Sequence, residues 1–180
     1  MESDRSKRRI VVGGRKLFQR QENRTQSPGR RAGFSATEGG HLFTLDPTGK
    51  PLEAVLARTL STVSPSDVSM VVAHGNANPI SDDSEARAIQ AVLHDVPVTA
   101  FKWSMGHTLC SSALIDTVLT LDCLRHRQIP GIATLHQKAP TCDALNVTSE
   151  TRTMSKGQHV LLINRGFASM NASLLLSSCD

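Results

Sequence analysis

Aromatic residues are scarce in this sequence, where they make up 3% of 180 residues, with one Trp and no Tyr. Proteins that bind single-stranded nucleic acid by stacking bases need aromatic faces, so this scarcity argues against a specific nucleic-acid reader. Long apolar runs are also missing, since none approaches the roughly 18 residues that a membrane span requires. With 39% hydrophobic residues, the chain is long enough to bury a core of its own. We therefore expect one soluble globular domain without a membrane association.

Metal and nucleotide signatures are absent as well. The four cysteines, Cys110, Cys123, Cys142 and Cys179, show neither the spacing of a zinc site nor that of a disulfide framework. No Gly-rich phosphate loop is present. Ligand spacing is also missing among the scattered histidines, which are His41, His94, His126, His136 and His159. We expect no metal and no bound cofactor, and a reducing compartment.

Positive charge is concentrated at the start of the chain, where residues 1–31 carry ten Lys or Arg against three acidic residues. Such a segment buries too little apolar surface to offset its ordering entropy, so we predict that residues 1–32 form a disordered basic leader. Nonspecific contact with RNA, anionic lipid or an acidic protein is the alternative. Early acidic residues argue against a secretory signal, which leaves a cytoplasmic location, with organelle import as the alternative.

Residues 33–180 are predicted to form the folded domain. Expected strands lie at 68–73, 97–101, 159–164 and 171–177; expected helices lie within 46–60, from Ser81 or Asp82 to about 93, and from Thr108 to about Arg125. The last of these helices reads as more buried than amphipathic, while the last two strands are joined too tightly for a crossover helix. This order predicts a layered α/β domain with a mixed sheet, parallel in its middle, and a C-terminal antiparallel strand pair at its edge.

His74 and His107 are the candidate catalytic residues, because each lies directly after a predicted strand. In an open α/β sheet, functional groups gather beyond the carboxyl ends of the strands. A histidine at a helix start has its cationic form disfavoured by the helix dipole, which favours a neutral imidazole at position 107. Spacing alone leaves two interpretations open: a shared site, or two unrelated structural histidines.

These segments resemble the C-terminal half of the β-ketoacyl synthases, condensing enzymes of the thiolase fold. The residues that carry the resemblance are His74-Gly-Asn-Ala-Asn78 for the family's His-Gly-Thr-x-Thr loop, Lys102 with Gly106-His107, Asp116 in the place of a Glu, and Gly166-Phe-Ala-Ser-Met-Asn-Ala-Ser173. The likeness runs from Gly33 to Ser177 and implies a thiolase-like half domain.

The resemblance implies decarboxylative condensation of a malonyl thioester in fatty-acid or polyketide biosynthesis. His74 and His107 would donate hydrogen bonds to the thioester carbonyl and stabilise the enolate, while Lys102 would pair with Asp116 and orient His107. The backbone amide of Phe167 would match the family's acyl oxyanion hole. The substrate would arrive on the phosphopantetheine of an acyl carrier protein.

Substrate contacts would come from Asn76 and Asn78, which stand where the family has Thr. Further departures are Arg165 in place of a gate Phe, and Ala168 and Ser169 in place of Gly. The nucleophilic Cys of the family belongs to an N-terminal half that is missing here. None of the four cysteines replaces it, since Cys110 and Cys123 fall inside the predicted long helix, where a buried Cys is inert.

Three interpretations therefore stay open. The chain is a synthase half that supplies the two-His site to a Cys-bearing partner, as a homodimer or heterodimer, or it is a noncatalytic partner of the chain-length-factor type. The third is a truncated synthase fragment.

Overall fold

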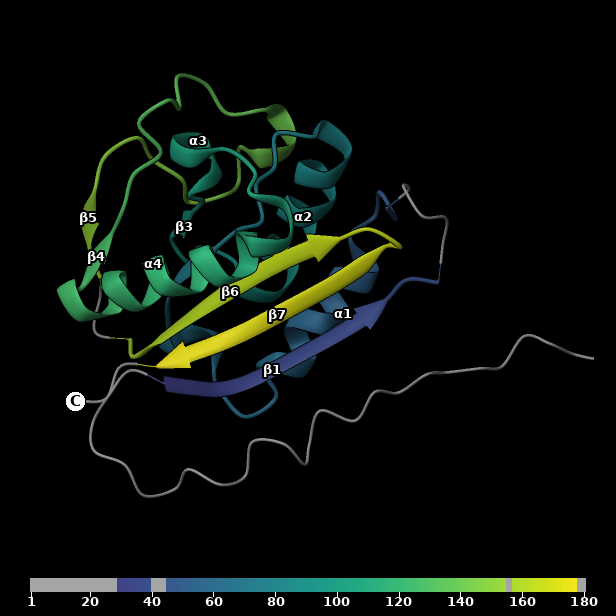
Figure 1. Ribbon diagram of the computed structural model, residues 1–180, viewed down its shortest axis with the longest axis horizontal. Helices are drawn as coiled ribbons and strands as arrows, with labels where there is room; N and C mark the ends of the chain where they lie inside the picture. Colours follow the sequence, from purple (N-terminus) through teal and green to yellow (C-terminus); the bar gives the residue numbers. More distant parts are fainter. Residues whose placement is uncertain (1–28, 40–44, 155–156, 178–180) are drawn as a thin grey trace, which may run out of the picture.

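A five-stranded mixed sheet forms the centre of the domain (Figure 1). The computed structural model describes residues 29–39, 45–154 and 157–177. The sheet has the order β1-β7-β6-β2-β3, made of β1 (Gly29–Thr37), β2 (Val68–Val72), β3 (Val98–Thr99), β6 (His159–Gly166) and β7 (Met170–Ser177). A separate antiparallel pair joins β4 (Gln128–Ile129) to β5 (Arg152–Thr153).

Strand directions confirm the predicted mixed sheet. β2 is parallel to both β3 and β6, whereas β6 and β7 form an antiparallel hairpin. The hairpin is not an edge pair, because β1 pairs antiparallel with the outer side of β7. The sequence pattern missed β1, and the expected domain boundary at Gly33 falls inside this strand. Most of the expected leader, residues 1–28, lies outside the described residues, as do His41 and Cys179.

Helices cover both faces of this sheet. The long helices of the domain are α1 (Lys50–Thr59), α2 (Pro79–Leu93) and α4 (Ser112–His126), and α3 (Lys102–Met105) is a single turn. α1 contacts α2, β1 and β7, whereas α4 contacts β6 from the other face (Figure 1). Short 3-10 turns lie at Pro65–Asp67, Leu109–Ser111 and Pro140–Cys142.

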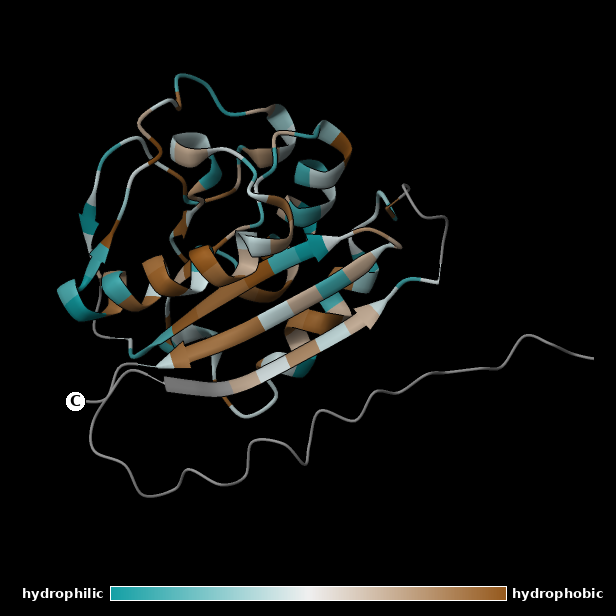
Figure 2. Ribbon diagram, viewed as in Figure 1, coloured by the Kyte–Doolittle hydropathy of each residue, from teal (hydrophilic) through white to brown (hydrophobic). Residues whose placement is uncertain are grey.

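Apolar spacing explains why these segments pack as they do. Leu52, Val55 and Leu56 of α1 are buried, as their helical spacing predicts. β2 is buried along its whole length, which suits a central strand covered on both faces. Figure 2 shows hydrophobic residues running along β6 and β7, whose inner residues join the two clusters that form the core on either side of the sheet.

The start of α2 differs from the expected cap. Asn78 is the N-cap, with its Oδ1 accepting hydrogen bonds from the amides of Ile80 and Ser81, and Pro79 takes the first helical position. The expected caps, Ser81 and Asp82, both lie inside the helix. The carboxylate of Asp82 instead accepts from backbone amides of the preceding loop.

α4 differs more strongly from the expectation of a buried helix. It begins at Ser112 rather than Thr108, and it buries a polar stripe at i, i+4 and i+8, formed by Ser112, Asp116 and Thr120. Two apolar side chains point outward, since Leu114 is 68% and Val118 57% exposed. The hydrophobic colour of α4 in Figure 2 therefore belongs in part to an outer surface.

The β6–β7 turn holds two non-glycine residues in left-handed backbone geometry, with φ of 59° at Ala168 and 53° at Ser169. A left-handed conformation costs an L residue about 1–2 kcal/mol. Glycine avoids this cost, but part of the gain in stability is lost because glycine makes the unfolded chain more flexible. We expect Ala168→Gly to raise the free energy of unfolding by about 0.5–1 kcal/mol, as measured by urea denaturation. Ala113→Gly inside α4 is the matched control and should lower it by about 1 kcal/mol. A loss of stability in both variants would contradict the strain at Ala168.

Candidate active site

Three parallel strands end at the same edge of the sheet and carry the candidate residues there. His74 lies two residues beyond β2, Lys102 and His107 follow β3, and Arg165 and Gly166 close β6. Because parallel strands align their carboxyl ends, segments far apart in the sequence meet at this edge. The structure thus brings both predicted histidines together.

The two imidazoles are in edge-on contact. The ring centroids of His74 and His107 are 5.4 Å apart and the ring planes meet at 78°. His74 is buried, whereas His107 is exposed. His107 does not open the long helix as expected, because Thr108 and the 3-10 turn Leu109–Ser111 separate it from the first residue of α4, Ser112.

Backbone amides set the same tautomer on both rings. The amide of Arg165 donates to Nδ1 of His74 at 3.4 Å, and the amide of Leu109 donates to Nδ1 of His107 at 3.0 Å. A neutral imidazole with an accepting Nδ1 carries its proton on Nε2. The site therefore offers two Nε2–H donors from neighbouring rings.

Two carboxylates from α2 hold the His74 loop in place. Glu85 accepts from the amides of His74 at 2.7 Å and Gly75 at 3.0 Å. Asp82 takes the next two amides, those of Asn76 and Ala77. Four successive amides are thus fixed by one helix face, and Gly75 suits this turn because a Cβ there would lie 2.9 Å from Cβ of Ala100. The sequence pattern suggested only a helix cap for Asp82 and no role at the site for Glu85.

Burial perturbs the protonation of these groups. The pKa of His74 falls to about 3, first because the ring is desolvated and then because Lys102, His107 and Arg165 lie nearby. Burial raises the pKa of Glu85 and of Asp82, although the loop amides and Arg165 act in the opposite direction. His74 is therefore neutral near pH 7, as a hydrogen-bond donor requires.

Lys102 and Asp116 form the pair that the resemblance implies. Nζ of Lys102 lies 3.0 Å from Oδ2 of Asp116, and both side chains are buried. The shorter Asp in place of Glu therefore still reaches the lysine. The pair links α3 to the buried polar stripe of α4.

Arg165 is the second residue whose role the sequence pattern did not reveal. Its guanidinium is buried and donates to Oδ1 of Asn171 at 2.9 Å, to the carbonyl of Ser81 at 2.9 Å and to Oγ of Ser84 at 3.3 Å. Glu38 lies 3.6 Å away as its counter-ion. A single side chain thus ties β6 to β1, β7 and the start of α2.

The remaining predicted residues occupy the rim. Phe167 is 70% exposed in the β6–β7 turn, so its ring does not belong to the core. Asn76 uses its Oδ1 to accept from the amide of Asn78, which itself caps α2, so both side chains stabilise the loop. Their NH₂ groups remain the donors with which they could contact a substrate.

The cysteines differ in their surroundings. Cys110 lies in the exposed 3-10 turn before α4, not inside the helix as expected. Cys123 is buried within α4, and burial raises the pKa of its thiol to about 11.

Within residues 29–39, 45–154 and 157–177, no group of three or more His, Cys, Asp or Glu side chains is arranged to hold a metal ion. Over the same ranges, no helix has the length and apolar character that crossing a membrane requires.

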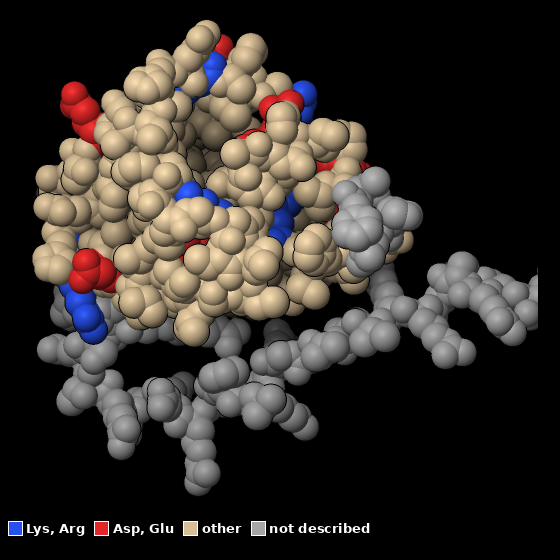
Figure 3. Space-filling model, turned by 45° about the horizontal axis from the view of Figure 1, so that its top comes forward, with Lys and Arg blue, Asp and Glu red and all other residues tan. Residues whose placement is uncertain are grey.

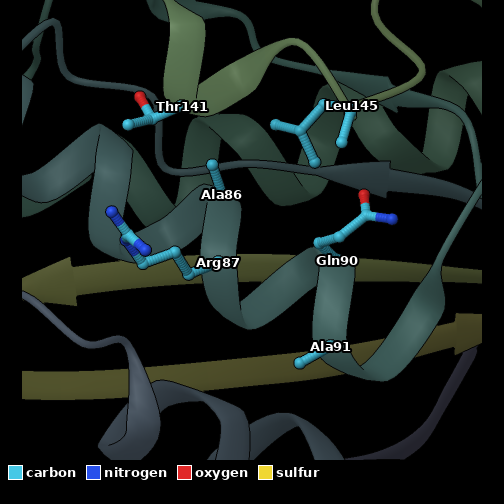
Figure 4. A pocket seen from close by; sticks show the side chains of 7 residues that line it. Ala86, Arg87, Gln90, Ala91, Thr141 and Leu145 are labelled. Atoms are coloured by element: carbon cyan, nitrogen blue, oxygen red, sulfur yellow. The ribbon is translucent and has the colours of Figure 1, made fainter.

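The surface of the domain is hollowed in places. The face in Figure 3 is hollowed near its centre, with basic and acidic side chains close to the hollow. A second hollow of about 300 Å³ lies on the outer side of α2 between Arg87, Gln90 and Thr141 (Figure 4), and none of the predicted site residues lines it.

Comparison with solved structures defines the class of fold. One chain of a structure described as a type II polyketide synthase acyl-carrier protein in complex with its ketosynthase matches 85% of this chain over 39% of its own length, with a TM-score of 0.79 and 20% identity. The ishigamide ketosynthase/chain length factor matches 82% of this chain and 37% of that chain, with a TM-score of 0.74 and 21% identity. The domain therefore has the thiolase-like ketosynthase fold.

Sequence comparison gives the family. Residues 29–136 match the model of the β-ketoacyl synthase C-terminal domain, so the chain belongs to the β-ketoacyl synthase family. The 3-oxoacyl-[acyl-carrier-protein] synthase 2 of Mycobacterium leprae is 32% identical over 143 residues, which make up 77% of this chain and 33% of that protein. A protein of the same name from Coxiella burnetii is 29% identical over 76% of this chain. The chain spans about a third of the length of these relatives.

The buried pair Lys102–Asp116 is expected to be strongly coupled. Removing one partner leaves an unpaired buried charge, so Lys102→Met and Asp116→Leu should each lower the free energy of unfolding by about 3–5 kcal/mol. The double variant should lose far less, because both charges are gone. Urea denaturation of the complete cycle measures this coupling. The exposed pair Lys50–Glu53 is the control, where Lys50→Met should cost less than about 1 kcal/mol. Additive losses at Lys102 and Asp116 would contradict the coupling.

His74 is expected to make stability fall in acid. Its pKa is about 3 in the fold against an ordinary value of 6.5, so the unfolded chain binds the extra proton between those values and stability rises with pH there. From pH 6.5 to pH 5 the protein should lose about 1.6 kcal/mol through this residue. His74→Gln should remove that part of the slope, as measured by urea midpoints at several pH values. Parallel pH profiles of the variant and the parent would contradict a buried neutral His74.

Proposed function

We propose that the chain supplies the two-histidine malonyl site of a 3-oxoacyl-[acyl-carrier-protein] synthase. The observation that carries this proposal is the pair of touching imidazoles, His74 and His107, whose accepting Nδ1 atoms leave both Nε2–H groups as donors. Family membership supports the same chemistry. Fatty-acid and polyketide synthases both occur among the relatives.

The chemistry follows from these two donors. When carbon dioxide leaves a malonyl thioester, the electron pair of the broken C–C bond moves into the thioester, and negative charge grows on the carbonyl oxygen. Donors already in place stabilise that charge, each by about 3 kcal/mol. His74 is suited to the task because it is buried and neutral. Asn76, Asn78 and the amide of Phe167 at the rim would contact the carrier-bound substrate, whose phosphopantetheine brings the thioester.

A partner chain would complete the site. The exposed apolar side chains gather around the histidines and on the outer face of α4: Trp103, Met105, Leu109, Leu114, Val118 and Phe167. Apolar surface of this extent marks an interaction site in a soluble protein. We therefore propose a homodimer or, with a synthase half that carries the nucleophilic Cys, a heterodimer, with an acyl carrier protein as the second partner. We further propose a cytoplasmic location.

A second candidate is a noncatalytic subunit of the chain-length-factor type. One observation favours it: one similar structure is that of a ketosynthase/chain length factor. In that case the apolar surface would serve docking, and the histidines would be dispensable. A truncated synthase fragment is the third interpretation, in which this surface finds no partner.

The decisive assay pairs this chain with a β-ketoacyl synthase whose own two active-site histidines are replaced by Ala. We expect release of carbon dioxide from malonyl carrier protein only when both chains are present. His74→Ala and His107→Ala should each lower the rate about 10²–10³-fold, because each removes one donor. His126→Ala, at the exposed end of α4, is the control with an unchanged rate.

The outcomes separate the three interpretations. A stable complex whose activity survives both histidine substitutions would contradict the donor mechanism, and a stable but inactive complex would favour the noncatalytic subunit. Light scattering after size-exclusion chromatography reports the complex. A chain that aggregates and binds no partner would favour the third interpretation, a truncated synthase fragment.

A further inference from the structure

A cavity of about 340 Å³ lies behind the loop that carries His74. This loop contributes Ala73, Gly75 and Ala77 to the cavity wall, whereas the alternate residues His74 and Asn76 do not line it. The other walls come from α2, β3 and the segment 132–147. The cavity is therefore separate from the two-histidine site, although both share one loop as a wall.

Most of this wall is apolar. Its larger side chains are Ile89, Val98, Ile132, Leu135, Leu145 and Val147. The volume falls at the lower end of the range for small-molecule pockets and has room for roughly ten water molecules of about 30 Å³ each. Such dimensions suit a single small ring or a short branched chain.

The charged groups of the wall are mostly engaged. Lys138 donates to the carbonyls of Asp143 at 3.1 Å and Leu145 at 2.8 Å. Asp83 accepts from the hydroxyl of Thr141, and both oxygens of Glu85 accept from the loop amides. With Asp82 there are three carboxylates against one lysine, so the wall favours a positively charged occupant.

Among the wall carboxylates, Asp82 has an oxygen that is buried without a partner. Its Oδ1 is buried and has no hydrogen-bond partner among the described residues. A buried acceptor without a donor is costly, and burial raises the pKa of Asp82 as well. A cationic donor placed beside Oδ1 would relieve both penalties.

We propose that this cavity binds a small, mainly apolar ammonium ion, whose N–H donates to Oδ1 of Asp82 while its hydrocarbon part fills the space lined by Ile89, Leu135 and Val147. A neutral alcohol supplies the hydrogen bond without the charge, and a carboxylate is repelled by the wall. This site is independent of the malonyl chemistry, so either proposal can fail while the other stands.

Binding of cyclohexylamine, cyclohexanol and cyclohexanecarboxylate to the full chain tests the charge preference, because the three probes share one ring. We expect saturable binding of the charged amine, at least tenfold tighter than the alcohol, and no binding of the carboxylate, by amide chemical-shift titration. The shifts should include the amides of Gly75 and Ala77. Equal affinity for amine and alcohol, or no saturation by the amine up to roughly 50 mM, would overturn the proposal.

Three variants locate the bound amine. Asp82→Asn should weaken amine binding at least tenfold, whereas Asp83→Asn, the matched change at a carboxylate that already has a partner, should weaken it less than threefold. Leu135→Trp places a larger side chain in the cavity and should abolish binding of the amine. Amine binding that survives Leu135→Trp, or that responds equally to the two Asp substitutions, would place the amine elsewhere and overturn the proposal.

Discussion

The hydrogen bonds between the carboxylates of α2 and the backbone of the His74 loop are the interaction on which the site depends. Glu85 and Asp82 take four successive backbone amides, from His74 to Ala77, and so set the path of the chain directly after β2. Buried carboxylates are costly, but here each accepts several N–H bonds and faces a nearby cation. The path of the loop is thereby fixed by contacts within the chain itself.

Arg165 completes this arrangement from the neighbouring strand. Its backbone amide fixes the tautomer of His74, while its guanidinium holds Ser81, Ser84 and Asn171. One residue therefore couples the orientation of an imidazole to the junction of β1, β7 and α2. An aromatic side chain at this position, as in the family pattern, has no donors for these contacts.

α4 buries polar residues and exposes apolar ones. Its polar stripe is buried because Lys102 and Asp116 satisfy one another there, and its apolar residues Leu114 and Val118 face outward. Because these apolar side chains stay exposed, α4 gains little free energy of folding from burial within this chain. The matched segment makes up only about a third of the relatives from Coxiella burnetii and Mycobacterium leprae.

Local patterns were enough for most of the architecture. The apolar spacing of α1, the β-branched run of β2 and the tight hairpin β6–β7 are visible in the sequence, and so is the position of both histidines after parallel strands. The quoted motifs also identified the family and the partnership of Lys102 with Asp116. Each of these depends on residues close together in the chain or on a resemblance that names them in pairs.

Contacts between distant segments had to come from the tertiary structure. The pairing of β1 with β7, the capture of loop amides by Glu85 and the enclosure of Arg165 depend on which surfaces meet, and no periodicity encodes that. The outward face of α4 was misread because an apolar helix looks the same whether its own chain or a partner covers it. Composition and spacing thus determined most of the elements and which residues stand at their ends, whereas packing decided which buried charges found partners.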